Sequence, residues 1–200
     1  MRIFLAGATG VIGVRLVPRL VSAGHVVAGM TRSADKAGIL RDLGAEPVIC
    51  DVFDRERLRE AVCTFGAECV VHELTDLPDD PSRIPELTAR NARIRREGTR
   101  NLLAAAQAAK ARRFLAQSVA WELPAGEGAD AVRELERSVL DAGGVVLRYG
   151  RFYGPGTYYE GELPPPPRVQ IDEAAARTVA ALEAPSAIIM VVDDAERSET

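Results

Sequence analysis

Lysine is scarce in this chain, and long apolar runs are missing. Lys36 and Lys110 are the only two lysines, so arginine carries nearly all of the positive charge. The net charge is −4, which leaves no basic field to attract a phosphate backbone and excludes nucleic acid as a partner. No apolar run reaches the roughly 18 residues that a membrane span needs, and Arg2 is followed at once by a strand-like segment rather than by a signal peptide. We therefore expect a cytoplasmic protein without a membrane partner.

Cysteine is also rare. Cys50, Cys63 and Cys69 are odd in number, lie in apolar contexts and form no CxxC pair. This pattern excludes a disulfide framework and a zinc site, and it favours reduced, buried thiols; we expect no metal. Hydrophobic residues make up 47% and charged residues 27% of the 200 residues, as in an ordinary globular domain.

Apolar runs of strand length alternate with segments of helical period, which is typical of a parallel sheet flanked by helices. We expect strands near residues 2–6, 26–30, 46–50, 68–72, 112–118, 144–149 and 187–192. We expect helices near residues 10–23, 34–43, 54–64, 83–109, 129–142 and 172–183. Pro18 should kink the first helix. The predicted fold class is α/β, a doubly wound parallel sheet of about seven strands.

Three glycines follow the first expected strand at intervals of three, in the stretch GATGVIG. The first can make a tight turn, the second leaves room for a pyrophosphate, and the third lets the helix lie close to the strand. Free N–H groups at the helix start would hold the phosphate charge, and a threonine hydroxyl lies within reach. The predicted nucleotide-binding residues of this turn are Gly7, Thr9, Gly10, Val11, Ile12 and Gly13. A glycine-rich turn without a ligand is the alternative.

The GxxGxxG spacing, with Ala8 and Thr9 inside it, resembles the short-chain dehydrogenase/reductase superfamily, in particular its extended and atypical branch of epimerases and dehydratases. Other segments that carry the resemblance are Cys50 to Val52, Val70 to Leu74, Arg96 to Leu103, Arg113 to Ser118, Leu147 to Gly156 and Val169 to Ala175. The resemblance implies a Rossmann-like fold and a nicotinamide cofactor. It also implies cofactor contacts from Asp51, Val52, Glu73 and Leu74, and a catalytic role for Ser118.

Extended members of that superfamily have a sizeable C-terminal region over the substrate, whereas this chain has only about forty residues after Gly161, including four consecutive prolines that should run as polyproline. We expect a dinucleotide-binding Rossmann domain over residues 1–160. Residues 161–200 would form a much reduced substrate or lid region packed on the same domain. A homodimer neighbour could cover the open cleft.

The end of the second expected strand indicates which nicotinamide is bound. An NAD site usually places a carboxylate there, whereas a 2′-phosphate favours arginine. The segment from Gly29 to Ser33 holds no acid and carries Arg32, so NADP is favoured and NAD is the second choice. Arg32 could equally be a solvated residue before a helix, and Asp51 could cap a helix rather than face the adenine.

The resemblance implies a tyrosine four residues ahead of a lysine on one helix, with Ser118 polarising the same substrate oxygen. No tyrosine lies between Ser118 and Tyr149, and aligning Glu136 with the family's late glutamate places Gly128 and Val132 at the two missing positions. If the protein is such an oxidoreductase, a different acid serves. The candidate catalytic residues are Ser118, Tyr153 and His72, with Tyr149 and Glu73 as further acids; His72 could instead close a strand end.

Three functions remain open at this point. The first is an NAD(P)-dependent oxidoreductase or epimerase/dehydratase-like enzyme with an atypical active site. The second is a non-redox tailoring enzyme, a cyclase or isomerase on a repurposed fold. The third is a non-catalytic nicotinamide-binding module. A small apolar or aromatic substrate would suit the aromatic residues expected to flank the site, which are Trp121, Phe152, Tyr153, Tyr158 and Tyr159.

Overall fold

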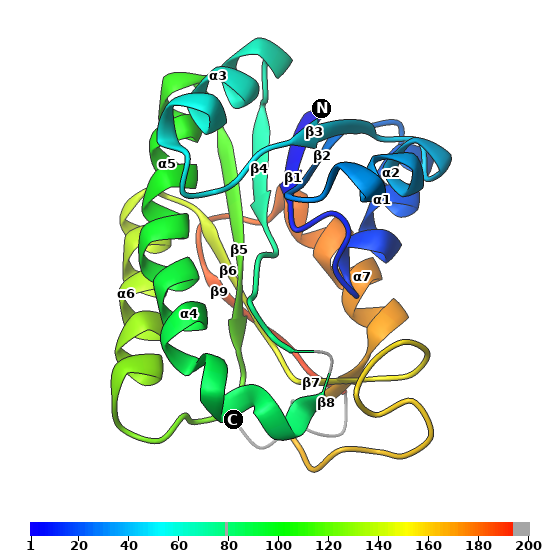
Figure 1. Ribbon diagram of the computed structural model, residues 1–200, viewed down its shortest axis with the longest axis vertical. Coiled ribbons are helices and arrows are strands. Elements are labelled where there is room, and N and C mark those ends of the chain that lie inside the picture. Colours follow the sequence, from blue (N-terminus) through cyan, green and yellow to red (C-terminus); the bar gives the residue numbers. More distant parts are fainter. Residues whose placement is uncertain (79, 194–200) are drawn as a thin grey trace.

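A seven-stranded, all-parallel sheet forms the centre of the protein, seen in Figure 1 in a computed structural model that describes residues 1–78 and 80–193. The strand order is β3-β2-β1-β4-β5-β6-β9. The strands are β1 (Arg2–Ala6), β2 (Val26–Thr31), β3 (Glu46–Ile49), β4 (Cys69–His72), β5 (Arg113–Val119), β6 (Val145–Tyr149) and β9 (Ile188–Val191). From β1 the chain first adds β2 and β3 on one side and then crosses to add β4, β5 and β6 on the other side. This change of side between β1 and β4 creates a crevice at the carboxyl ends of the strands.

Helices cover both faces of the sheet (Figure 1). They are α1 (Gly13–Ser22), α2 (Ala37–Asp42), α3 (Arg55–Phe65), α4 (Thr88–Arg93), α5 (Thr99–Ala108), α6 (Glu127–Asp141) and α7 (Ile171–Ala180). Alternate residues of β1 show the layering: Ile3 and Leu5 pack in an apolar cluster with α1, α2 and α7, while Phe4 and Ala6 pack with α3, α5 and α6. The fold is therefore a Rossmann-like α/β sandwich, as the sequence predicts.

The C-terminal region joins the same core. Val169, Ile171 and Val191 belong to the apolar cluster that contains β1 and α1. Two short strands that the sequence reading missed, β7 (Arg151–Tyr153) and β8 (Arg168–Gln170), pair in parallel beside the main sheet. They carry the chain from the end of β6 to the start of α7.

The helical segment expected at residues 83–109 differs from a single long helix. It begins as a 3-10 turn over Pro81–Leu87, becomes α4, passes through a π-helical turn over Ile94–Gly98 and continues as α5. Pro85 lacks the N–H that would donate to the carbonyl of Pro81 in a regular α-helix. The first helix also begins later than expected, at Gly13, and it runs through Pro18 to Ser22.

The structure also bears on the expectations for the cysteines and for a membrane span. Cys50 and Cys69 are buried and free, but Cys63 lies exposed on α3, contrary to the expectation of three buried thiols. Across residues 1–78 and 80–193, every helix is too short or too polar to cross a lipid bilayer.

Candidate active site

One large cleft opens where the carboxyl ends of the parallel strands meet. It runs from the glycine turn after β1, past the ends of β2 and β4, to the end of β5 and the loop after β6. Residues that represent these five walls are Gly10, Arg32, Glu73, Ser118 and Phe152. The fold thus brings the glycine turn and the expected catalytic serine to one continuous surface.

The glycine turn is built so that two of its glycines are required by packing. Gly7 has a φ of +91°, and a Cβ there would lie 2.6 Å from the Glu73 carbonyl oxygen. A Cβ on Gly13 would lie 2.2 Å from the Gly7 carbonyl oxygen. A Cβ on Gly10 would meet only the Gly7 oxygen, at 3.2 Å, and would otherwise point into open space. The space above Gly10 is therefore the place where a ligand can approach the backbone.

This open turn fits a dinucleotide pyrophosphate. Within the described ranges, the N–H groups of Val11 and Ile12 donate to no backbone carbonyl, and they lie at the positive end of the α1 dipole. The Thr9 hydroxyl lies 3.3 Å from that of Thr31 and ties the turn to the end of β2. The chain's own residues therefore supply a suitable phosphate cradle.

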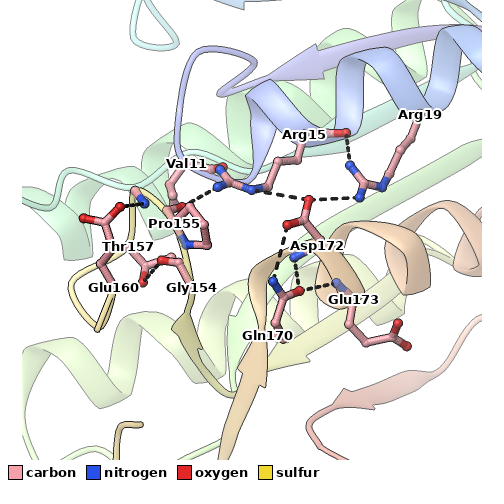
Figure 2. A network of polar contacts seen from close by, with 11 residues as sticks. Val11, Arg15, Arg19, Gly154, Pro155, Thr157, Glu160, Gln170, Asp172 and Glu173 are labelled. Atoms are coloured by element: carbon pink, nitrogen blue, oxygen red, sulfur yellow. Dashed lines mark hydrogen bonds and ion pairs between the residues drawn. The ribbon is translucent and has the colours of Figure 1, made fainter. Parts of the chain in front are cut away.

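A polar network clamps the loop after β7 against the start of α1 (Figure 2). The Arg15 guanidinium donates to the Val11 carbonyl at 2.7 Å and to the Pro155 carbonyl. Asp172, in the first turn of α7, accepts from Arg19 at 2.9 Å and lies 3.6 Å from Arg15. Because these contacts join segments far apart in the sequence, they hold one wall of the cleft beside the glycine turn.

Arg32 lies at the end of β2 and lines the cleft, as expected for a residue near the adenosine ribose. Its side chain is 51% exposed and lies 3.5 Å from Asp76, whose other carboxylate oxygen is 2.9 Å from Arg90. Ser33 and Lys36 line the same part of the cleft. This end of the cleft is therefore positively charged.

A small recess next to Arg32 is lined by Val52, Phe53 and Leu74, so two of the residues expected to contact the cofactor lie together. Asp51 does not line it. The Asp51 carboxylate is exposed and accepts from the Phe53 N–H at 2.9 Å, which closes the turn before α3. Asp51 does not cap α3 either, because the N-cap is Asp54, whose carboxylate accepts from the Arg57 N–H at 3.2 Å.

His72 does not face the cleft, contrary to its expected catalytic position. Its ring is buried, with Nδ1 accepting from the Leu74 N–H at 3.2 Å and Nε2 lying 3.1 Å from the Thr99 hydroxyl. Burial, together with the charge of Arg95, lowers the pKa of His72 to about 3. The imidazole is therefore a neutral anchor at the end of β4, joined to α5.

Tyr153 also lies away from the cleft lining, and its hydroxyl donates to Asp193 at 3.2 Å. The other four aromatic residues expected around the site do line the cleft; they are Trp121, Phe152, Tyr158 and Tyr159. The Arg151 guanidinium lies 4.8 Å from the centre of the Trp121 ring.

Ser118 lines the cleft and is buried, but its hydroxyl proton is already used. Ser118 Oγ donates to Glu136 at 2.6 Å, and Arg148 donates to both oxygens of the same carboxylate at 2.8 and 2.6 Å. Although burial by itself would raise the pKa of Glu136, the hydrogen bonds from Arg148 and Ser118 hold it below its ordinary value. Gly128 lines the cleft where the family's tyrosine was expected, and Val132 does not.

Glu73 is a buried acid among the residues that line the cleft. Tyr149 donates to its Oε1 at 3.0 Å, and Oε2 has no hydrogen-bond partner within the described residues. Burial raises the pKa of Glu73 to about 8, so the carboxyl group is mostly protonated at neutral pH. The site therefore holds a neutral carboxylic acid with one oxygen hydrogen-bonded to Tyr149 and the other without a hydrogen-bond partner in the described residues.

Two cleft residues were missed by the sequence reading. Gln117 has a buried Nε2 without a partner, and Arg95 reaches the cleft from the π-helical turn. Neither stands out in the sequence, because Arg95 is one of several arginines in a charged helical segment and Gln117 is one residue of a strand. Among the described residues, no group of three histidine, cysteine or acidic side chains could hold a metal ion.

Residues 7–142 match the protein family described as NAD(P)H-binding. The chain belongs to this family. A curated relative named 3-diazoavenalumate denitrifying reductase, from a Streptomyces species, is 39% identical over 240 aligned positions that cover 98% of this chain and 77% of the relative. A sterol-4-alpha-carboxylate 3-dehydrogenase (decarboxylating) from Dictyostelium discoideum is 31% identical over 85 residues, covering 42% of this chain and 25% of that protein.

The fold matches solved structures of the same type. The UDP-glucose 4-epimerase of Thermus thermophilus, in complex with NAD, has a TM-score of 0.78 and 21% identity, and the match covers 96% of this chain and 78% of that one. Family, relatives and fold together identify an NAD(P)-dependent enzyme of the oxidoreductase or epimerase-like kind, with a nicotinamide cofactor.

Proposed function

We propose that this NAD(P)H-binding protein is an NADPH-dependent reductase of a small aromatic substrate, with Glu73 as its proton donor. The observation that carries the proposal is the buried carboxyl group of Glu73 in the lining of the cleft, with Oε1 accepting from Tyr149 and Oε2 without a hydrogen-bond partner among the described residues. The reductase class is supported by the 39% identical relative, whose name is that of a reductase. When bound, the nicotinamide cofactor supplies a hydride.

The proposed cofactor site runs along the positive part of the cleft. The amides of Val11 and Ile12 would hold the pyrophosphate, and Arg32 would hold the 2′-phosphate of NADP(H). The Arg32 side chain is 51% exposed and lies 3.5 Å from Asp76, so it is free to turn toward a phosphate. Asp76 would keep Arg90 as its partner, 2.9 Å away.

Glu73 is suited to donate a proton because it keeps one through neutral pH. Its ordinary pKa of 4.5 is raised to about 8 by burial, which brings it close to the working pH at which a general acid is most effective. Tyr149 fixes the orientation of the carboxyl group, and the Tyr149 hydroxyl lies 2.6 Å from that of Thr178. The proton would be donated from Oε2, which has no hydrogen-bond partner within the described residues.

Ser118 would play a different part from the serine of the resembled family. While Glu136 is ionised, the serine proton points to that carboxylate, so the Ser118 oxygen offers only lone pairs to a ligand. We infer that Ser118 positions a substrate donor group and that it does not polarise a carbonyl. The aromatic side chains of Trp121 and Phe152 would hold the substrate ring.

Binding and turnover of the two nicotinamide cofactors test the proposal. Fluorescence of Trp121, the only tryptophan of the chain, and calorimetry would measure binding of NADPH and NADH; absorbance would follow NADPH oxidation with a panel of aromatic carbonyl and diazo compounds. We expect NADPH to bind more tightly and to be oxidised. Tight binding without oxidation of NADPH by any of these compounds would contradict a reductase and favour non-redox chemistry.

Substitution of Arg32 tests the NADP preference. Arg32→Ala should weaken NADPH binding by about 10–100-fold, because a hydrogen bond to a charged group contributes about 1.5–3 kcal/mol, and should change NADH binding less than about threefold. Arg59→Ala is the matched control, since Arg59 is 62% exposed on α3. Equal losses for NADPH and NADH would contradict the assignment of the 2′-phosphate to Arg32.

A further inference from the structure

One arginine in the helical segment that follows β4 differs from its neighbours. Arg90, Arg93, Arg96 and Arg100 each lie within ion-pair distance of a carboxylate, at 2.9, 2.7, 3.2 and 3.6 Å respectively. Within residues 1–78 and 80–193, Arg95 has neither an ion pair nor a hydrogen bond, although its guanidinium is partly buried. A partly buried charge without a counter-ion is unfavourable, which suggests a ligand as the missing partner.

The π-helical turn aims this side chain into the cleft. Arg95 lies in the turn Ile94–Gly98, between α4 and α5, and it is the residue of this turn that lines the cleft. π-helical turns inside longer helices occur frequently at functional sites. Arg95 of this turn lines the cleft, whereas Arg93 and Arg96 donate to Glu97 and Glu134 respectively.

Three other arginines of the cleft lining differ from Arg95 because each of them has an acceptor. Arg15, Arg32 and Arg151 line the cleft too, but each has an acceptor: the carbonyls of Val11 and Pro155, the carboxylate of Asp76, and the carbonyls of Pro165 and Pro166.

None of the carboxyl groups of the cleft lining is a counter-ion of Arg95 in the described residues. Asp76 is shared by two arginines, and Glu127 lies 3.2 Å from Arg96. Glu73 carries its proton at neutral pH. The part of the chain that the structure describes thus offers Arg95 no anion.

A second unsatisfied donor lines the same cleft. Gln117, next to Ser118, has a buried Nε2 with no acceptor within the described residues. A guanidinium and an amide N–H that both lack acceptors within the described residues are suited to a ligand rich in acceptor oxygens. The phosphates of the cofactor have their own cradle at the glycine turn, so these two donors are left for the substrate.

We infer that Arg95 binds the carboxylate of an aromatic carboxylic acid substrate, whose ring lies against Trp121 and Phe152. The inference rests on the proposed function, because it names the class of substrate for the same cleft. A planar guanidinium can hold both oxygens of a carboxylate, and the aromatic wall takes the ring. Arg95 is thus a specificity-determining residue.

The test compares an acid with its ester. The probes are 4-hydroxycinnamate and its methyl ester, titrated calorimetrically into the protein saturated with NADP⁺, with Trp121 fluorescence as a second readout. The wild type should bind the acid at least about tenfold more tightly than the ester. Arg95→Gln should weaken binding of the acid by about 10–100-fold and of the ester by less than about threefold. Arg95→Lys should recover part of the affinity for the acid.

The matched control is Arg100→Gln, since Arg100 is 68% exposed and lies on α5, close to the π-helical turn. It should leave both affinities unchanged. Equal losses for acid and ester in Arg95→Gln would overturn the inference. So would a loss of NADPH affinity as large as the loss for the acid, because the guanidinium would then serve the cofactor.

The wild type alone distinguishes this inference from the proposed function. If it binds NADPH but does not prefer the acid to the ester, the inference fails and the proposed function stands. If it does not bind NADPH, the proposed function fails. The wild-type comparison also keeps the inference testable if Arg95→Gln does not fold, and Arg95→Lys, which keeps the charge, provides the second variant.

Discussion

Replacing Glu73 with glutamine should change how the stability of the protein depends on pH. The Glu73 carboxyl group is buried, accepts from Tyr149 at 3.0 Å, and has its pKa raised from 4.5 to about 8 by burial. Glutamine keeps the shape and the acceptor oxygen but cannot ionise. The difference in stability between the two proteins therefore isolates the titration of this one group.

The magnitude follows from the two pKa values. Between pH 4.5 and about 8 the native state holds a proton that the unfolded chain has released, so the wild type loses stability as pH rises through this range. The full difference corresponds to about 5 kcal/mol as an upper bound, and to about 3 kcal/mol at pH 7. Relative to wild type, Glu73→Gln should gain up to about 3 kcal/mol between pH 5 and pH 8.

Urea unfolding at about pH 5, 7 and 8, followed by circular dichroism, measures the free energy of unfolding of each protein. The new amide leaves an N–H without an acceptor, but this cost is the same at every pH and cancels from the slope. His72 and the other titrating groups cancel as well, since both proteins contain them. Glu122→Gln, at an exposed glutamate, is the control and should show no change in slope.

A difference between wild type and Glu73→Gln that stays constant from pH 5 to pH 8 would refute the reasoning, because Glu73 would then titrate as an ordinary carboxylate. Activity provides an independent check. If Glu73 donates the proton, turnover of the wild type should fall as pH rises through about 8, and Glu73→Gln should lose about 10²–10⁴-fold in turnover while still binding NADPH.

Two further predictions concern the glycine turn and the buried ion pair. Gly13→Ala should destabilise the protein by about 3 kcal/mol, because its Cβ would lie 2.2 Å from the Gly7 carbonyl oxygen, whereas Gly10→Ala should unfold like wild type but bind NADPH about tenfold more weakly. Equal unfolding temperatures for both variants would contradict this. Arg148→Met should cost about 2 kcal/mol at pH 7 by leaving the Glu136 carboxylate with one donor, and the loss should shrink as Glu136 becomes protonated at acidic pH. Urea unfolding of wild type and Arg148→Met at pH 7 and at acidic pH measures the loss of stability. A loss of the same size at the two pH values would contradict the prediction.

The central strands of the main sheet were predictable because apolar residues predominate in β1, β4 and β6, as expected for strands buried on both faces. Strands β7 and β8 were not, since three residues are too few to show a period of two. The π-helical turn at Ile94–Gly98 has no sequence signature of its own, so the sequence did not reveal that Arg95 leaves the helical surface.

The sequence could not predict the direction in which single side chains of the site point. Successive side chains of an extended chain point to opposite faces, so the end of β4 directs His72 toward Thr99 of α5 and Glu73 toward Tyr149 of β6. The same alternation separates Phe152, which lines the cleft, from Tyr153, which does not. The sequence identified both pairs of residues but not which member of each pair faces the ligand.

The absence of the tyrosine and lysine pair changes where the charges of this site lie. With Gly128 and Val132 at the two expected positions, α6 supplies neither the tyrosine nor the lysine there, while the adjoining π-helical turn, which packs against α6, contributes Arg95 to the lining of the same cleft. A lysine beside a tyrosine stabilises a phenolate, whereas a neutral Glu73 needs no cation to lower its pKa. We infer that the positive charge has thereby become available for the substrate, which links the atypical acid to an anionic ligand.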